Sequence, residues 1–360
     1  MVDQKCSRGW AIEGRKGRLP EQIAQMSSVA IKEAFESALN RLVSRLFAGV
    51  GEVSNLARLS GGASQETWSF DILDGKHPRR IILRRAPTGY SATFASAGLR
   101  TEARLIELAG KSGVPSPCVL HVLRPEDELG DGFLMDYVHG ETIPRKILRD
   151  AVFAEIRPRL AFELGKILAR IHAMPGAGLE TLREITAQAA IKELHLAYQA
   201  DGCPRPVFEL AFRWLQEQAL LRPEAVTLVH GDFRNGNLIV GADGVRAVLD
   251  WELAHFGDPM EDLGWLCVNS WRFGIIDKPV GGFGQLSELI AGYQSAGGRT
   301  VDPRRVMLWQ TLGTLRWGVV CLGMLARYES GRDRSIERAM IARRASETEI
   351  DLLRIIAPRA

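Results

Sequence analysis

One short segment of the chain combines the residue types that phosphoryl transfer requires. It reads VHGDFRNGN and is followed, after a turn, by VLDWE. The carboxylate of Asp232 can orient a hydroxyl nucleophile, and Arg234 supplies a cation for the transferring phosphate. Asn237 and Asp250 offer the hard oxygen atoms that Mg²⁺ prefers. The spacing therefore indicates transfer of a phosphoryl group from MgATP to a hydroxyl.

The residues around this segment predict that its side chains meet at one surface. Short β-prone runs occupy residues 227–229, 238–240 and 246–249. Asn235 and Gly236 suit a tight bend, which would return Asn237 towards Asp232. We therefore expect a loop between two strands, with Asp250 at the end of the next strand.

The segment resembles the catalytic core of the aminoglycoside phosphotransferase and choline kinase family, whose fold is protein-kinase-like. The family motif is H-G-D-x-x-x-x-N followed by a metal-binding Asp. The resemblance implies that Asp232 is the catalytic base and that Asn237 and Asp250 are Mg²⁺ ligands. The resemblance also implies that Arg234 occupies the position at which protein kinases carry a Lys in the catalytic loop. Asp262, within DPMEDLGW, resembles a family residue that supports the loop backbone.

Composition and charge restrict the class of protein. The chain has 360 residues, of which 46% are hydrophobic and 25% charged, and this is typical of a globular protein large enough for two lobes. Its net charge of +3 and scattered basic residues do not indicate a nucleic-acid partner. The apolar run at 317–326 is too short to span a membrane. The five cysteines lack the spacing of zinc or redox motifs.

We expect a cytoplasmic protein with ATP and Mg²⁺ as cofactors and no membrane partner, and the sequence leaves the oligomeric state open. Residues 1–20 lack the apolar run of a secretory signal and are expected to be a disordered lead-in. The N-terminal nucleotide-binding lobe is predicted at 21–139. The C-terminal lobe, which carries the catalytic and acceptor-binding residues, is predicted at 140–360.

The order of expected elements predicts an α+β, two-lobe, protein-kinase-like fold with a small antiparallel-sheet N-lobe and a mainly helical C-lobe. A helical pattern spans 21–47. It precedes strands at 55–59, 67–73 and 81–84, a helix at 101–112, and strands at 119–123 and 133–137. After Gly140, helices are expected at 157–173, 182–200, 207–221, 261–271, 284–296, 303–328 and 334–356.

Two sets of residues in the N-lobe are candidates for holding phosphates. Backbone N–H groups of Gly61, Gly62 and Ser64 can cradle phosphate oxygens, although an ordinary hairpin turn is the alternative. The family resemblance also implies a cation on the α- and β-phosphates, usually Lys, paired with a Glu of the next helix. The matching residues are Arg84 and Glu102. A solvated edge cation and a solvated helix face are the alternatives.

The strand that leads into the second lobe supplies the candidates for binding adenine. Asp136, Tyr137 and Val138 would form the hinge, whose backbone meets the base, and a plain buried strand is the alternative. Glu252 is a candidate either for reaching the metal or for anchoring the loop.

The acceptor is expected to be a small molecule. A short segment separates Glu252 from Asp258, where a protein kinase carries a long activation segment for docking peptides. In residues 261–360, Lys and Arg outnumber Asp and Glu. A polycationic aminoglycoside would need an acidic cleft, so this balance disfavours one.

A narrower resemblance suggests which acceptor to test first. The segments GGASQET, ILRRAP, HGDFRNGN and LDWELAHFGDPMEDLGW are similar to kinase domains associated with acyl-CoA dehydrogenases. That subgroup includes kinases acting on hydroxyacyl-CoA. Aminoglycoside, choline and homoserine phosphotransferases are the alternatives. A non-catalytic nucleotide-binding regulator is an alternative of another class, because Arg84 replaces the usual Lys.

Overall fold

The computed structural model describes residues 28–47, 52–59, 65–74, 77–86, 96–200, 202, 204–219, 225–331 and 335–357. The predicted lead-in at 1–20 lies outside these residues. So does the turn that contains Gly61, Gly62 and Ser64.

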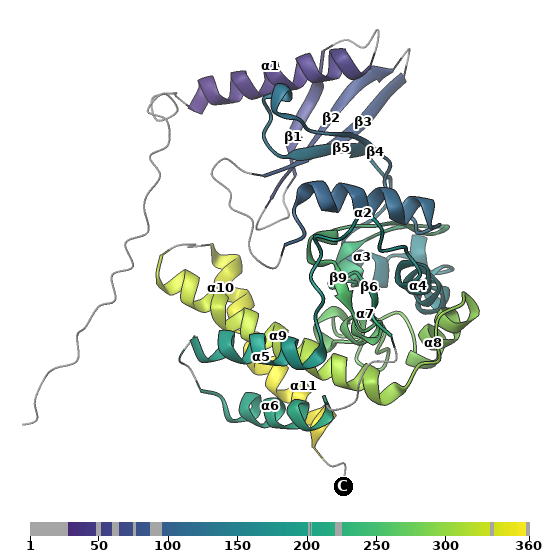
Figure 1. Cartoon of the computed structure of the whole chain (residues 1–360), viewed down its shortest axis with the longest axis vertical. Helices are drawn as coiled ribbons and strands as arrows, with labels where there is room; N and C mark the ends of the chain where they lie inside the picture. The colour runs from purple at the N-terminus through teal and green to yellow at the C-terminus, as the bar shows by residue number, and fades with distance from the viewer. Residues whose placement is uncertain are drawn as a thin grey trace, which may run out of the picture.

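A five-stranded antiparallel sheet with the order β1-β2-β3-β5-β4 forms the upper part of the molecule in Figure 1. Its strands are β1 (Ser54–Arg58), β2 (Glu66–Asp74), β3 (His77–Arg85), β4 (Val119–Val122) and β5 (Gly132–Asp136). Helix α1 (Ser28–Leu46) lies against one face, and α2 (Leu99–Lys111) lies between the sheet and the helical part.

Apolar side chains of β3 point alternately to the two faces of the sheet, and both faces are covered. Ile81 and Leu83 pack in a cluster with Leu39 of α1, whereas Ile82 belongs to the large cluster that contains Leu105 of α2. Successive side chains of a strand point to opposite faces, so this short apolar run contributes to two cores.

The second part of the chain is mainly helical. Its helices are α3 (Pro144–Arg149), α4 (Arg157–His172), α5 (Ala187–Ala200), α6 (Pro206–Gln218), α7 (Met260–Leu266), α8 (Leu286–Ser295), α9 (Pro303–Glu329), α10 (Ile336–Ala342) and α11 (Ala345–Ile356). Proline stands in the first turn of α3, α4, α6 and α9, where its missing N–H has no intrahelical partner to lose.

Two small sheets interrupt the helices and carry the loop predicted to be catalytic. One pairs β6 (Thr227–Val229) with β9 (His255–Gly257), and the other pairs β7 (Leu238–Gly241) with β8 (Gly244–Val248). The loop HGDFRNGN joins β6 to β7, and Asp250 follows β8.

The predicted fold class is confirmed, with some differences in its elements. The helix expected at 334–356 is two helices, which turn at Arg343 and Arg344 so that α11 packs on α9. The helix expected at 182–200 begins only at Ala187, and α3 and β9 were not predicted. Strand β9 is three residues long and exists by pairing with β6, which no local pattern reveals.

The division between residues 139 and 140 stays a prediction. Just after it, the backbone of Glu141 pairs with Val240 through hydrogen bonds of 2.9 and 3.0 Å. The chain therefore enters the helical part beside β7, close to the catalytic loop.

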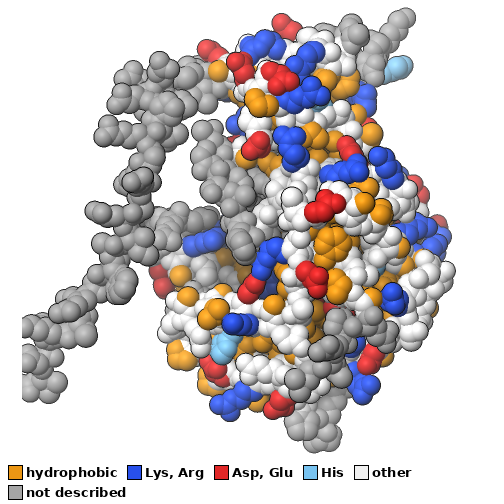
Figure 2. Space-filling model, in the orientation of Figure 1, with side chains coloured by type: hydrophobic (Ala, Val, Ile, Leu, Met, Phe, Trp, Pro, Cys, Tyr) orange, Lys and Arg blue, Asp and Glu red, His pale blue; other side chains and the backbone are white. Residues whose placement is uncertain are grey.

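The described surface agrees with the charge expected from the sequence. On the face shown in Figure 2, Lys and Arg side chains are intermixed with Asp and Glu. Among the described helices, none combines the length and apolar character needed to cross a membrane.

Candidate active site

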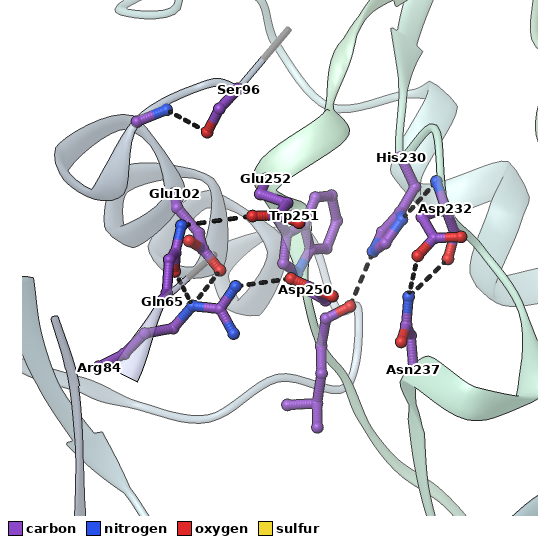
Figure 3. Close-up of polar contacts among 12 residues, drawn as sticks. Gln65, Arg84, Ser96, Glu102, His230, Asp232, Asn237, Asp250, Trp251 and Glu252 are labelled. Carbon is purple, nitrogen blue, oxygen red and sulfur yellow. Dashed lines mark hydrogen bonds and ion pairs between the residues drawn. The ribbon is translucent and has the colours of Figure 1, made fainter. Parts of the chain in front are cut away.

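The carboxylate of Asp232 is held on both of its oxygen atoms. Trp265 Nε1 donates to Oδ1 at 2.7 Å, and Arg234 Nε donates to the same oxygen at 3.0 Å. Asn237 Nδ2 donates to Oδ2 at 2.7 Å and also to the Asp232 carbonyl at 2.9 Å. The loop therefore closes on itself as its bend predicts, and the orientation of the Asp232 carboxylate is set by its neighbours (Figure 3).

The buried carboxylate of Asp262 supports the start of the loop. It accepts the backbone N–H groups of His230 at 2.7 Å and Gly231 at 2.9 Å, and His172 Nε2 lies 3.1 Å away. Burial alone would raise the pKa of Asp262, but the hydrogen bond and electrostatic interaction with His172 and the contacts with His230 hold it below its ordinary value.

His230 braces this loop as a neutral ring. Burial lowers its pKa. Its Nε2 lies 3.0 Å from the Leu249 carbonyl, and Nδ1 accepts the Asp232 N–H at 3.2 Å. Since a carbonyl only accepts, the proton of the neutral ring is on Nε2. Both ring nitrogens of His230 thus form hydrogen bonds with backbone groups, which agrees with a role in holding the loop in shape.

Gly231 has a conformation that this turn requires. Its φ is +76°, and a Cβ at this position would overlap the carbonyl of Leu253. Glycine allows both the left-handed backbone and the close approach of the chain.

Arg84 joins the sheet to the catalytic part of the molecule. Its Nε lies 3.1 Å from Glu102 Oε1 and 2.5 Å from Gln65 Oε1, and its Nη2 donates to Asp250 Oδ1 at 2.6 Å. Figure 3 shows Arg84, Gln65 and Glu102 on one side of Asp250, with Asp232 on the other. Burial opposes the charge of Arg84, but Glu102 and Asp250 raise its pKa above the ordinary value.

Glu102 is the buried partner of this cation. Burial raises its pKa to about 7, although the charge of Arg84 acts in the opposite direction. Its Oε2 is buried and has no hydrogen-bond partner among the residues that the structure describes. The carboxyl group therefore holds its proton to a higher pH than an exposed Glu does.

Asn237 and Asp250 fit the demands of a magnesium ion. The amide nitrogen of Asn237 is committed to Asp232, which leaves its Oδ1 as the atom able to bind metal. Asp250 has φ +65° and ψ +63°, a left-handed conformation uncommon for a residue with a side chain. Within the described part of the chain, Asn237 Oδ1 and Asp250 Oδ2 accept no hydrogen bond, so each has the free hard oxygen that a Mg²⁺ ligand requires.

The expected hinge residues turn their side chains to the sheet. Arg79 Nη2 donates to Asp136 Oδ1 at 2.8 Å, and the Arg80 guanidinium lies 5.4 Å from the centre of the Tyr137 ring. Val138 is half-buried where the chain leaves β5. Glu252 anchors the loop: its carbonyl accepts the Ala97 N–H at 2.8 Å, and its carboxylate lies 3.4 Å from Gln65 Nε2.

Two residues that contact the candidate site were not predicted from the sequence. Gln65 contacts Arg84, and Trp265 contacts Asp232. A signal for Trp265 was present, because it lies one helical turn after Asp262 in DLGW. Residues three apart on a helix are neighbours on its surface, so both could reach the same loop.

A cavity of about 270 Å³ has Trp265, the residue whose indole N–H contacts Asp232, in its wall. Much of its lining is apolar: Leu182, Ile185, Leu194, Leu253, Ala254 and Leu312. Its polar side chains include Arg316 and the His255–Glu261 pair, whose closest atoms lie 3.2 Å apart. A small molecule seated here would lie against the indole that contacts Asp232.

Comparison with known proteins agrees with this geometry. The model of the phosphotransferase enzyme family (APH) matches residues 55–299. Mouse acyl-CoA dehydrogenase family member 10 is 29% identical over 254 residues, which cover 66% of this chain and 22% of the mouse protein. The chain thus corresponds to about a fifth of that relative.

Solved structures share the fold. A protein of Ralstonia eutropha JMP134, provisionally assigned as an aminoglycoside phosphotransferase, has a TM-score of 0.69 at 20% identity, covering 89% of this chain and 97% of its own. Aminoglycoside phosphotransferase APH(4)-Ia, solved with AMP-PNP and hygromycin B, has a TM-score of 0.59 at 18% identity, covering 90% of this chain and all of its own. The chain belongs to the phosphotransferase enzyme family and has its protein-kinase-like fold.

Proposed function

We propose that the chain transfers the γ-phosphoryl group of MgATP to the hydroxyl of a small molecule, with a hydroxyacyl-CoA as the first acceptor to test. The observation that carries this proposal is the arrangement of Asp232, Asn237 and Asp250 opposite the buried pair of Arg84 and Glu102. A base, hard oxygen ligands and a phosphate-binding cation are the parts that phosphoryl transfer uses.

In this proposal Asp232 receives the acceptor hydroxyl. The bond between the γ-phosphorus and the β–γ bridging oxygen breaks, the acceptor oxygen bonds to phosphorus, the hydroxyl proton passes to Asp232, and ADP leaves. Arg234 lies 3.0 Å from the Asp232 carboxylate, and in this proposal it would stabilise the negative charge that develops on the transferring group.

The nucleotide is assigned to the residues around Arg84. Arg84 would bind α- and β-phosphate oxygens, while Glu102 keeps the guanidinium in place. Asn237 Oδ1 and the Asp250 carboxylate would hold Mg²⁺, which neutralises charge on the β- and γ-phosphates when bound. The adenine is assigned to the backbone of Asp136, Tyr137 and Val138, and the phosphate cradle to Gly61, Gly62 and Ser64.

Support for an acyl acceptor comes from the cavity and from the comparison. The largely apolar lining suits a hydrocarbon chain better than a polyamine. The mouse relative carries the name of an acyl-CoA dehydrogenase family member.

The test is an acceptor screen with purified protein and MgATP. Hydroxyacyl-CoAs of several chain lengths are compared with kanamycin, choline and homoserine, with ADP release measured and the phosphorylated product identified by mass spectrometry. We expect a phosphorylated hydroxyacyl-CoA. Efficient phosphorylation of kanamycin, with no turnover of any hydroxyacyl-CoA, would identify an aminoglycoside as the acceptor instead. Stabilisation by MgATP in thermal unfolding, without turnover of any acceptor, would favour a nucleotide-binding regulator.

A further inference from the structure

One face of α9 forms a wall of the cavity next to Asp232. Trp309, Leu312, Gly313 and Arg316 line the cavity, and their spacing of three and four residues puts them on one side of the helix. Trp265 of α7 lines the same cavity and reaches Asp232 through its indole N–H. The acceptor cavity and the proposed base are thus connected by one aromatic side chain.

Arg316 brings a positive charge to the wall of this cavity. Its guanidinium lies 5.0 Å from the centre of the Trp265 ring, and its Nη1 lies 3.5 Å from the carbonyl of Gly231, next to the base. Among the residues that the structure describes, Arg316 makes no ion pair. The other charged groups in the wall are matched by opposite charges: Arg183 with Glu193, and His255 with Glu261.

The small residue at position 313 permits this arrangement. A Cβ on Gly313 would lie 2.8 Å from the six-membered ring of Trp265 and 3.0 Å from a methyl group of Val268. Glycine therefore lets α9 approach α7 closely enough for the indole to lie between Arg316 and Asp232.

We infer that Trp265 is a positioning residue for Asp232 and that, together with Arg316, it selects acceptors carrying an acyl oxygen near the reacting hydroxyl. Arg316 would donate to that oxygen, whether it belongs to a thioester carbonyl or to a free carboxylate, while the apolar wall holds the chain. A guanidinium stacked on an indole keeps its donors in a fixed plane. This inference rests on the proposed kinase function and adds the chemical class that the acceptor site recognises.

The role of Trp265 is tested by Trp265→Phe. Phenylalanine keeps an aromatic wall but removes the N–H that holds Asp232, so we expect kcat to fall by roughly 10- to 100-fold, with the KM for MgATP changed less than about twofold. Gly313→Ala, which displaces the indole without removing its N–H, should lower kcat in the same direction.

Trp68→Phe is the matched control. Trp68 lies in β2, outside the wall of the cavity, and its Nε1 donates to a different carboxylate, Glu66 Oε2, at 3.3 Å. Its replacement removes the same kind of bond without touching Asp232 or the cavity. Equal losses of kcat in Trp265→Phe and Trp68→Phe would overturn the positioning role.

The role of Arg316 is tested with three acceptors that share one hydroxyalkyl chain: the CoA thioester, the free hydroxy acid and the diol without an acyl oxygen. In Arg316→Gln we expect the acceptor KM to rise about tenfold or more for an acyl-bearing acceptor, and little for the diol. The thioester and the free acid separate the two sources of the acyl oxygen. Equal effects on all acceptors and on the KM for MgATP would contradict selection by Arg316.

A failure of the proposed kinase function can be distinguished from a failure of the roles inferred for Trp265 and Arg316. If the wild-type protein phosphorylates none of these acceptors but does phosphorylate kanamycin, choline or homoserine, phosphoryl transfer stands and this inference is contradicted. If it phosphorylates no acceptor at all, the proposed function is wrong and this inference falls with it. If the wild type is active and the Trp265 and Arg316 variants match it, the proposed function stands and only this inference is contradicted.

Discussion

Arg84 Nη2 lies 2.6 Å from Asp250 Oδ1, although the two residues are 166 positions apart in the chain. The contact joins the last residues of β3 to the segment that follows β8. It brings the proposed phosphate-binding cation and a proposed Mg²⁺ ligand together, as expected of groups that would hold the same nucleotide. Glu102 completes the set from α2, at 3.1 Å from Arg84.

The first prediction concerns the proposed base. Asp232→Asn keeps the shape of the side chain but removes the group that takes the hydroxyl proton, so kcat should fall by about 10²- to 10⁴-fold. Asp243→Asn is the control, because Asp243 is an exposed turn residue bound to Arg246. Steady-state kinetics and thermal unfolding would be measured for both. Wild-type turnover by Asp232→Asn would remove Asp232 from the mechanism.

The second prediction concerns the metal. Asp250→Asn removes a negative charge from the proposed Mg²⁺ site, so the Mg²⁺ concentration for half-maximal activity should rise about tenfold or more. Binding of a fluorescent adenine nucleotide should weaken less, because adenine is assigned to hinge backbone. A Mg²⁺ titration that coincides with that of the wild type would show that Asp250 does not bind the ion.

The third prediction is a pH dependence that arises from Glu102. Burial raises its folded-state pKa to about 7, from 4.5 as its ordinary value. Between these values the folded protein binds more protons than the unfolded chain, so the free energy of unfolding decreases as pH rises through this window. The decrease is roughly 3 kcal/mol once both states are ionised.

Glu102→Gln lacks this ionisation and tests the effect directly. In thermal unfolding in EDTA at pH 5, 6, 7 and 8, Tm of the wild type should fall relative to Tm of Glu102→Gln as pH rises. Glu107→Gln, on the same helix but only half-buried, serves as the control and should follow the wild type. A difference between the wild type and Glu102→Gln that stays constant with pH would contradict the assignment.

The fourth prediction concerns the packing of α4 on α8. A Cβ on Gly292 would overlap the carbonyl of Phe162, whereas a Cβ on Gly323 of α9 would meet nothing within 4 Å. Gly292→Ala should therefore destabilise the fold by about 1–3 kcal/mol, and Gly323→Ala should stabilise it by about 0.5–1 kcal/mol through helix propensity. Denaturant unfolding of the two variants provides the comparison, and equal effects would refute the close crossing.

Much of the fold and part of the site were readable in the sequence because their signals are local. The alternation in β2 and β3, the proline and glycine positions and the motif HGDFRNGN are all patterns over a few residues. The same holds for the return of Asn237 to Asp232, which spans five positions and follows from a tight bend. The resemblance built on these motifs led to the family and to the fold class.

Tertiary structure alone decided which distant groups meet. Trp265 bonds to Asp232, Arg84 reaches Asp250, and β9 exists by pairing with β6. The cavity proposed to take the acceptor is likewise lined by residues of α5, α7, α9 and the segment after β8. Apart from the three-residue spacing of Asp262 and Trp265, these contacts have no local signature, because each depends on how helices and sheets pack and on which side chains they bury. The sequence by itself therefore determined the chemistry available to this protein, whereas packing determined which residues surround it.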